Sequence, residues 1–473
     1  MEYLKEKYYP VLSEWTFLKG VRGNYFLFDF LSAKEYRVTD FQANLLVYCD
    51  GSTNLSQLFE KFSVSREKLT VFLKKFEVEA LLKFTSETSA SSKMAKLQIP
   101  PPYLKEVHVD VTSACNLRCR HCYQEPYLNP LSSGTDLRTE EILNLLDQMR
   151  ELNVTKFVLS GGEPFLRTDL LEIIDYAFSQ GIFLSTLFTN GTIANSSIVN
   201  YLSSYKFPTY IAVSIDGDDS ESHDFLRGQG SFQKTIDFLK LLRSFKYQGA
   251  RFQYLVDTIV HRRNYKKLLS MFNLFRSIGV PRWRIAMPRD QGSYTSFKSE
   301  IGVNETEVFS EYEKLIREYL TYFRNIGNYL PMDIQIESIF RTSMLTKKRI
   351  NVFFLSDSCC EYKRNAIAIK PNGDVTICTA FTNLALGNIR ENSLAEIWYS
   401  DKTQKIKNLS IGEIEECKDC QYIAFCGTGC RRMALDKRNS LFAKDESACP
   451  VYEFFYEWVW PILQQQGVKI VTL

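Results

Sequence analysis

The sequence has no excess of charge of one sign, because 58 Lys and Arg residues face 55 Asp and Glu residues, a formal net charge of +3. It therefore lacks the strongly basic field that is typical of nucleic-acid-binding proteins. It also lacks any run of about 18–20 consecutive apolar residues, the length that a membrane span requires. The first residues, Met-Glu-Tyr-Leu-Lys-Glu-Lys, contain no apolar stretch of a signal peptide. We expect a soluble, cytoplasmic protein.

Cysteine is abundant and very unevenly placed, with 12 residues in the chain. One is Cys49, three lie between Cys115 and Cys122, and eight lie between Cys359 and Cys449. A secreted disulfide scaffold is normally a short chain with its cysteines spread throughout. Dense groups in a chain of 473 residues instead favour metal ligation in a reducing compartment. The isolated Cys49 is expected to be an inert buried thiol.

Residues 1–85 predict a small winged-helix-like domain. Runs rich in Tyr, Phe and Val indicate strands, and apolar residues at helical spacing indicate helices. The expected elements are strands at 24–30 and 34–38, helices at 39–48, 54–62 and 66–77, and a closing strand at 80–84. Residues 86–102 open with a polar stretch of small side chains that is typical of a linker.

Residues 103–335 alternate strands with helical patterns. The expected strands are 106–112, 156–160, 183–189, 210–216, 251–260 and 283–287, and the expected helices are 139–152, 170–180, 197–205, 232–245 and 265–278. Six strand–helix repeats predict parallel pairing with right-handed crossovers, in a doubly wound sheet or in a complete or partial barrel. The fold class is therefore α/β, with chemistry expected at the carboxyl ends of the strands.

Residues 336–473 form a cysteine-rich domain with short turns and little regular periodicity, so we expect metal to organise it. The aromatic stretch 454–460 is interpreted as a packed terminal helix rather than as an interfacial membrane anchor.

The most specific motif is Cys115-Asn-Leu-Arg-Cys119-Arg-His-Cys122, directly after the first strand of the α/β segment. Three thiolates on a short loop can hold three corners of a 4Fe–4S cluster and leave one iron without a protein ligand. Clusters that only carry electrons usually have four cysteine ligands. A structural zinc loop is the other interpretation of this spacing.

The cysteine loop resembles the signature of the radical S-adenosylmethionine (SAM) superfamily, although His121 stands where an aromatic residue is usual, and Tyr123 follows the last cysteine. The resemblance implies a partial (β/α)6 barrel and a SAM molecule bound to the open iron. Ser160-Gly-Gly-Glu-Pro164 resembles the element that binds the SAM amino group, with Gly161 and Gly162 allowing close backbone approach.

Further polar residues at strand ends match the family position by position. Glu163 is implied to pair with the ammonium of SAM, and Arg227 to clamp its carboxylate. A turn-forming role for the strand-end residues, and a surface salt bridge for Arg227, are the structural alternatives. The implied SAM contacts are Tyr123, Gly161, Gly162, Glu163, Pro164, Asn190, Ser214, Asp216 and Arg227.

The cysteines after residue 359 resemble the SPASM extension of radical SAM enzymes that modify peptides and proteins. By this resemblance, Cys360, Cys378 and Cys430 hold a first auxiliary 4Fe–4S cluster. A second, fully ligated cluster falls to Cys417, Cys420, Cys426 and Cys449, for which zinc is the alternative. Cys359 either completes the first auxiliary cluster or leaves it with an open iron.

The N-terminal domain resembles the PqqD-like element that binds the leader of a ribosomally made precursor peptide as an added strand. Nucleic-acid binding is the alternative, but acidic and basic residues interleave between 50 and 79 and leave no basic stripe.

Together these resemblances imply a radical SAM peptide maturase that forms a thioether between a cysteine and a carbon of another residue, by way of a 5′-deoxyadenosyl radical. An external one-electron reductant, such as flavodoxin or ferredoxin, is a further implied partner. The alternatives are a carbon–carbon or carbon–oxygen crosslink, or a non-catalytic electron-transfer protein. The residues do not identify the catalytic acid or base, and Asp257, Tyr254 and Cys359 are candidates only by location.

Overall fold

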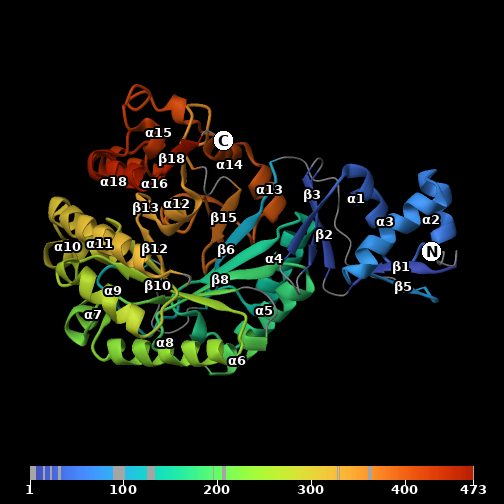
Figure 1. Cartoon of the computed structure of the whole chain (residues 1–473), viewed down its shortest axis with the longest axis horizontal. Coiled ribbons are helices and arrows are strands. Elements are labelled where there is room, and N and C mark those ends of the chain that lie inside the picture. Colours follow the sequence, from blue (N-terminus) through green and yellow to red (C-terminus); the bar gives the residue numbers. More distant parts are fainter. Residues whose placement is uncertain are drawn as a thin grey trace.

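The computed structural model has an elongated shape, with a small N-terminal unit beside a larger body (Figure 1). None of the described helices is long and apolar enough to cross a membrane. The structure describes residues 7–13, 16–21, 24–29, 34–88, 102–124, 134–194, 196–204, 209–327, 329, 331–360 and 365–471. The predicted linker at 86–102 therefore lies mostly outside the described residues.

The N-terminal unit contains every element that its sequence predicts. Its helices begin at side chains that cap them, because Thr39, Asn54 and Ser65 each accept a backbone N–H of the first turn. Its elements are β1 (Tyr9–Leu12), β2 (Thr16–Val21), β3 (Asn24–Asp29), β4 (Lys34–Val38), α1 (Asp40–Leu46), α2 (Leu55–Phe62), α3 (Arg66–Val78) and β5 (Leu82–Thr85). β1 pairs antiparallel with β5, and β2, β3 and β4 form a separate antiparallel sheet. Its winged-helix likeness stays a prediction.

The three-stranded sheet of this unit packs on the larger body near the start of β8 (Phe183–Thr189). The ring of Phe28 stacks on that of Phe183, with 5.5 Å between the centroids. Phe17 lies against Gly181, so both aromatic residues join the main hydrophobic core. Because Phe183 begins its strand, the N-terminal unit contacts the end of the barrel opposite the carboxyl ends of the strands.

The larger body is built on a sheet of 11 strands (Figure 1). Its central strands are all parallel, and six of them were predicted. These six are β6 (Glu106–Asp110), β7 (Lys156–Ser160), β8, β9 (Tyr210–Ser214), β10 (Gln253–Ile259) and β11 (Arg282–Ala286). β12 (Asp333–Ile336) continues the parallel order, and β13 (Phe340–Arg341) closes it antiparallel. This arrangement confirms the α/β class with a partial barrel.

Helices cover the outer face of the sheet, and most of them bury its apolar side chains in one continuous core, whereas the helices at 220–227 and 293–301 contribute to a separate small cluster. The helices of this layer are α4 (Thr139–Glu151), α5 (Leu170–Ser179), α6 (Ser196–Ser204), α7 (Ser220–Arg227), α8 (Ser231–Tyr247), α9 (Leu268–Ser277), α10 (Ser293–Ile301), α11 (Glu305–Asn325) and α12 (Thr342–Lys347).

The cysteine-rich region is joined to the barrel through the same sheet. β15 (Ala366–Ile369) pairs parallel with β6, and β16 (Asp374–Thr376) and β17 (Ala385–Asn388) extend the edge. Its other elements are β14 (Arg349–Asn351), α13 (Leu394–Tyr399), α14 (Asp401–Lys407), α15 (Ile423–Cys426), α16 (Arg431–Arg438), α17 (Cys449–Phe454), η7 (Phe455–Val459), α18 (Trp460–Gln465) and β18 (Lys469–Val471). The predicted terminal helix is present at 454–460, where Phe455 and Trp460 are buried.

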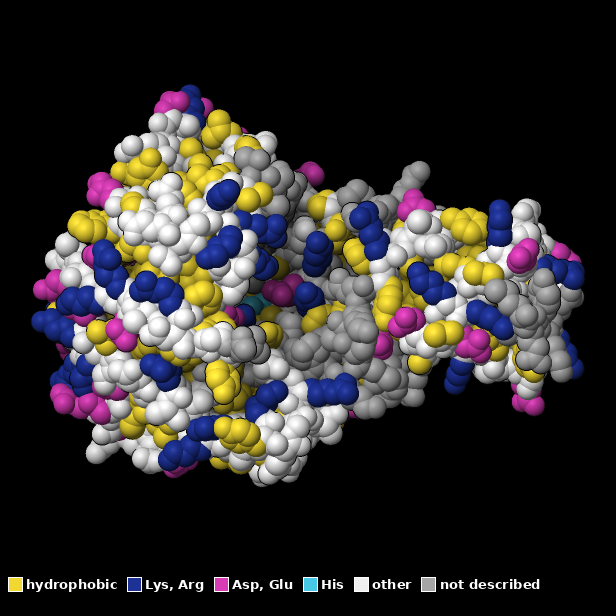
Figure 2. Space-filling model, in the orientation of Figure 1, with side chains coloured by type: hydrophobic (Ala, Val, Ile, Leu, Met, Phe, Trp, Pro, Cys, Tyr) yellow, Lys and Arg dark blue, Asp and Glu magenta, His cyan; other side chains and the backbone are white. Residues whose placement is uncertain are grey.

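Charges of both signs are scattered over the face of the molecule seen in Figure 2, including the N-terminal unit on the right. This distribution agrees with the small net charge, and no basic stripe crosses the unit on this face.

Candidate functional site

The predicted cluster loop follows β6 at the carboxyl end of the parallel strands. A turn closed by the Cys122 N–H on the Cys119 carbonyl (3.1 Å) brings two of the three cysteines together. Burial raises the pKa of the Cys119 thiol to about 12, and the neighbouring Cys115 and Cys122 add to the shift. A buried thiol of this kind ionises readily only when a metal compensates its charge. The loop therefore fits a metal cluster.

Gly161 and Gly162 hold the tip of β7 against the start of this loop. The Gly162 N–H donates to the Thr112 carbonyl (2.7 Å), and the Glu163 N–H donates to the Ala114 carbonyl (2.8 Å). A Cβ on Gly161 would lie 2.6 Å from the Thr112 oxygen, and one on Gly162 would overlap the Ala114 carbonyl. In the structure these glycines thus let two backbone segments approach each other, whereas the resemblance implies only the approach of a ligand.

Glu163 is fully buried between the tips of β7 and β8. Its carboxylate accepts the Asn190 N–H (2.7 Å), the Thr189 hydroxyl (2.8 Å) and the Phe165 N–H (3.2 Å). Burial raises its pKa to about 7, although these hydrogen bonds oppose the shift. Pro164 begins the short turn that follows. The predicted contact of Glu163 with an ammonium stays a prediction.

Asn190 connects the end of β8 to the cluster loop. Its amide donates to the Asn116 side chain (2.9 Å) and accepts the Thr192 N–H (2.9 Å). The Asn116 amide in turn donates to the Thr192 hydroxyl (2.8 Å). Asn116, which the sequence did not single out, thus fixes the loop between Cys115 and Cys119.

Asp216 and Arg227 form a buried ion pair beside the same loop. The Arg227 guanidinium also lies 4.0 Å from the Cys119 sulfur. Burial would raise the pKa of Asp216, but Arg227, His121 and other neighbours lower it overall. Asp216 and Arg227, both predicted to contact SAM, therefore neutralise each other's charge in the structure. Binding of the SAM carboxylate by Arg227 stays a prediction. Ser214, half-buried, ends β9 just before them.

Histidines surround this ion pair, although the chain contains only four. The His121 Nε2 atom lies 3.5 Å from the Arg227 guanidinium, and His223 Nδ1 accepts the Asp216 N–H (3.0 Å). His261 Nε2 lies 3.1 Å from the Asp216 carbonyl oxygen. The scarcity of histidine is the signal that could have pointed to this cluster.

Tyr123 follows the loop. The Arg289 guanidinium lies over the Tyr123 ring, 5.0 Å from the ring centroid. Burial raises the pKa of Tyr123 to about 12, and Arg289 partly offsets the effect. Arg289 comes from the segment after β11, where the Ser293 N–H donates to the Cys122 carbonyl (3.0 Å). This segment, which the sequence did not single out, covers the cluster loop.

A buried polar network ties the loop to the cysteine-rich region. The Lys370 ammonium donates to Asp110 (3.2 Å), to the Gln124 side chain (2.9 Å) and to the Thr379 carbonyl (2.9 Å). Lys370 and Asp110 are almost fully buried. The segment before Cys378 and the end of the cluster loop are therefore held at a fixed separation.

The cysteine-rich region contains two separate sets of thiols. Cys360 interacts electrostatically with Cys378 and Cys430, and burial, the largest cause, raises its pKa to about 12. The other set surrounds a cavity of about 120 Å³ with Thr428, Lys444 and Asp445; its members are Cys417, Cys420, Cys426 and Cys449. Within the described ranges, no three His, Cys, Asp or Glu side chains converge closely enough to hold a single metal ion. The four-cysteine cavity fits a cluster that spreads its ligands apart.

Cys359 lies next to Cys360, with which it interacts electrostatically, but its side chain packs in the same apolar cluster as Cys417 of the second set. It is buried in an apolar cluster with Leu409, Ile411 and Ile414, and its N–H donates to the Leu409 carbonyl (2.8 Å). Cys49 is fully buried in the N-terminal unit and contacts the Leu45 carbonyl. Cys49 is therefore packed as an apolar side chain, whereas the Cys359 thiol also has a hydrogen bond with Thr428.

The two other acid–base candidates have structural partners. Asp257 forms a bidentate pair with Arg284 (2.5 and 2.6 Å), and the Tyr254 hydroxyl donates to the Gly279 carbonyl (2.8 Å).

Comparison with known proteins gives matches in the barrel and in the cysteine-rich region. Residues 109–282 match the Radical SAM superfamily, and residues 359–421 match the SPASM iron–sulfur cluster-binding domain. A radical SAM domain binds SAM and a 4Fe–4S cluster, and a SPASM domain binds auxiliary iron–sulfur clusters. These are the cofactors of this chain.

Several relatives are similar over most of the chain. The AdoMet-dependent heme synthase of Nitratidesulfovibrio vulgaris is 25% identical over 355 residues, 73% of this chain and 92% of that protein. The antilisterial bacteriocin subtilosin biosynthesis protein AlbA of Bacillus subtilis is 26% identical, covering 69% of this chain and 67% of that protein.

Among solved structures, Streptococcus suis SuiB bound to precursor peptide SuiA has a similar fold. Its TM-score is 0.63 at 16% identity, and the match covers 93% of this chain and 99% of that chain. With its fold, its cysteine loop and both domain matches in agreement, the chain belongs to the radical SAM superfamily and carries a C-terminal SPASM domain.

Proposed function

We propose that this radical SAM enzyme binds a ribosomally made precursor peptide and joins one of its cysteine sulfurs to a carbon of another residue. The N-terminal unit would bind the leader, and the carboxyl end of the barrel would receive the segment to be modified. The observation that carries the thioether assignment is the placement of Cys359.

The Cys359 thiol is hydrogen-bonded to Thr428 and packs with Cys417, both of which line the four-cysteine cavity, and this placement favours Cys360, Cys378 and Cys430 as the ligands of the first auxiliary cluster. Three ligands leave one iron of a 4Fe–4S cluster open to a ligand from outside the protein. A cysteine thiolate of the peptide is the ligand for which such an iron has the highest affinity. The second set has four cysteines and needs no such ligand.

The likeness to SuiB supports a peptide as the substrate. Its match covers 93% of this chain, a share that residues 103–473 alone cannot supply, so the shared fold includes part of the N-terminal unit. That structure is bound to a precursor peptide, and AlbA acts in the biosynthesis of a bacteriocin. The heme synthase matches 73% of the chain, about the same share as AlbA at 69%, so the choice of a peptide rests on the fold shared with SuiB.

When bound, SAM and its cluster supply a carbon-centred radical that removes hydrogen from an unactivated C–H bond. The chain's own residues prepare the place for this chemistry. Asn116 and Asn190 fix the cluster loop, and Glu163 presents a buried carboxylate at the strand ends. Tyr123 and Arg289 pack against each other at the end of the loop.

The atoms and electrons of this reaction balance. The only oxidants that it needs are SAM and an electron acceptor. One C–H hydrogen passes to 5′-deoxyadenosine, the thiol releases its proton, and one electron leaves as the S–C bond forms. The holoenzyme, reduced anaerobically and given a cysteine-bearing precursor, should make 5′-deoxyadenosine and a peptide with fewer free thiols. Formation of 5′-deoxyadenosine with a crosslinked peptide that keeps all its thiols would contradict the thioether and favour a carbon–carbon or carbon–oxygen bond.

A further inference from the structure

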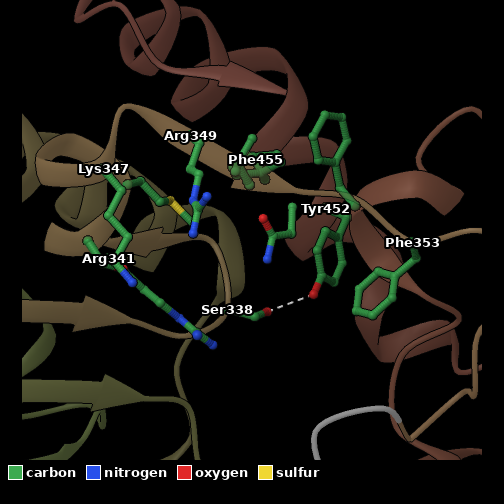
Figure 3. A pocket seen from close by; sticks show the side chains of 12 residues that line it. Ser338, Arg341, Lys347, Arg349, Phe353, Tyr452 and Phe455 are labelled. Atoms are coloured by element: carbon green, nitrogen blue, oxygen red, sulfur yellow. Dashed lines mark hydrogen bonds between the residues drawn. The ribbon is translucent and has the colours of Figure 1, made fainter. Parts of the chain in front are cut away.

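A second cavity, of about 250 Å³, lies between the segment that follows β12 and the carboxyl-terminal helices (Figure 3). One side of it is basic, because Arg341, Lys347 and Arg349 line it from α12 and its flanking strands. The other side is aromatic. Its rings belong to Phe353, Phe425, Tyr452 and Phe455.

One residue of the aromatic side, Tyr452, also belongs to the wall of the four-cysteine cavity. Tyr452 lines both cavities, and its hydroxyl is hydrogen-bonded to Ser338 (2.7 Å) across the mouth of the basic one. Phe425 directly precedes Cys426. The Phe353 ring packs against Gly427, because a Cβ added to Gly427 would lie 2.9 Å from the ring. The basic cavity and the four-cysteine cavity are therefore neighbours that share Tyr452.

The rim of this basic cavity has the character of a docking surface. Lys347 and Arg349 are exposed, and neither forms an ion pair with any carboxylate in the described part of the chain. Phe354 and Leu355, just beyond the aromatic side, are 43% and 48% exposed. Exposed apolar side chains beside a charged rim are typical of protein interaction sites.

The position of the cavity distinguishes between two possible partners. It has no lining residue from the cluster loop at 115–122, where the peptide must react, but it shares a wall with the four-cysteine cavity. A protein that exchanges electrons must bring its redox group close to a cluster. We propose that the surface formed by Arg341, Lys347, Arg349, Phe354 and Leu355 binds an acidic one-electron carrier protein that exchanges electrons with the second auxiliary cluster.

This proposal rests on the proposed function, which releases one electron in each turnover. The carrier takes up that electron from the auxiliary cluster, so the carrier is reduced and the cluster is oxidised by one electron. Acidic side chains on the carrier would meet the basic rim, and such long-range attraction mainly accelerates association.

The test measures binding of oxidised flavodoxin, an acidic one-electron carrier, to the holoenzyme at low ionic strength. Lys347→Glu combined with Arg349→Glu should weaken binding about tenfold and flatten its dependence on salt. Lys234→Glu, an exposed reversal on α8, is the matched control and should leave binding unchanged. Iron content and dithionite-driven SAM cleavage should be the same in all three proteins.

Unchanged flavodoxin binding in the double variant, or equal loss in Lys234→Glu, would overturn the proposal. So would a double variant that loses affinity for the precursor peptide while it still binds flavodoxin, because the surface would then be a peptide site. The milder Lys347→Gln provides the same comparison if the double variant loses iron. Failure of SAM cleavage with dithionite in the unaltered enzyme would instead contradict the proposed function.

Discussion

The ion pair between Asp216 and Arg227 lies beside the cluster loop, and both side chains are almost completely buried. Two charges removed from water are tolerated only when each finds its partner and further hydrogen bonds. Asp216 has these, since it also accepts the Ile259 N–H (2.7 Å). The pair thus fixes α7 against the end of β9, beside the cluster loop, whether or not Arg227 also contacts SAM.

Asp216→Asn should strongly destabilise the protein, because it leaves the Arg227 charge buried without its partner. Loss of one member of a buried pair costs about 3–5 kcal/mol of the free energy of unfolding. The measurement is denaturant unfolding of the reconstituted holoenzyme. Asp237→Asn, which removes an exposed carboxylate near Lys240, is the control and should leave the midpoint unchanged. Equal midpoints for both variants would contradict the structural role of the pair.

The adjacent cysteines 359 and 360 provide a second test at this scale. Cys360→Ala should remove about four iron atoms per chain from about twelve, because a cluster loses one of its ligands. Cys359→Ala should keep all the iron, since the thiol lies in an apolar cluster. Iron and sulfide analysis of the reconstituted proteins measures both. Equal iron loss from the two variants would place Cys359 in the cluster.

At the scale of elements, the contact between β7 and the cluster loop depends on the absence of a side chain. Gly161 has a φ of +140°, and Gly162 leaves no space for a Cβ against Ala114. Because the neighbouring atoms are backbone, they cannot move without moving the loop that contains Cys115. The pair of glycines therefore positions the loop as well as any ligand.

Gly162→Ala should consequently displace the loop and reduce SAM-cluster assembly. We expect it to lose about four iron atoms per chain while both auxiliary clusters remain. Gly134→Ala is the matched control, because nothing lies within 4 Å of an added Cβ there. Full iron content and SAM cleavage in Gly162→Ala would show that the loop tolerates the displacement.

Most elements could be predicted because their signals are local. Thr39, Asn54 and Ser65 mark helix starts, and the parallel strands are short apolar runs. β1, β2 and α11 were not predicted; Pro10 weakens the strand pattern of β1, whose partner β5 lies far along the chain. The bond between Lys370 and Asp110 joins residues 260 positions apart, so no local pattern could indicate it.

At the scale of the whole molecule, the N-terminal unit is attached to the barrel through a contact that includes a buried cation. Lys19 is only 4% exposed. Burial, with a smaller contribution from Arg150, lowers its pKa to about 7. A lysine that is less basic in the folded state binds fewer protons there than in the unfolded chain, so stability rises with pH between the two pKa values.

Lys19→Met should remove this pH dependence. Between pH 7 and the ordinary lysine pKa of about 10.4, the melting temperature of the parent should rise relative to that of the variant. The difference between the two proteins, measured by calorimetry across this range, isolates Lys19 from other titrating groups. A difference that stays constant with pH would contradict burial of a neutral Lys19 at this contact.

The same contact determines how the molecule would process a peptide. The N-terminal unit meets the barrel at Phe183, at the opposite end of the strands from the cluster loop. A peptide held by its leader on this unit must therefore extend along the barrel before its reactive residues reach Cys115–Cys122. We expect a spacer between leader and modified residues, a property of the substrate that the domain order alone does not indicate.

The central claim is that this chain removes hydrogen from a carbon of a peptide with a radical made from SAM. The most direct measurement supplies the anaerobic holoenzyme with a precursor peptide deuterated on its carbon atoms and determines the mass of the 5′-deoxyadenosine produced. We expect 5′-deoxyadenosine that carries deuterium, in proportion to the thiols lost from the peptide. Unlabelled 5′-deoxyadenosine alongside a fully modified peptide would contradict this claim.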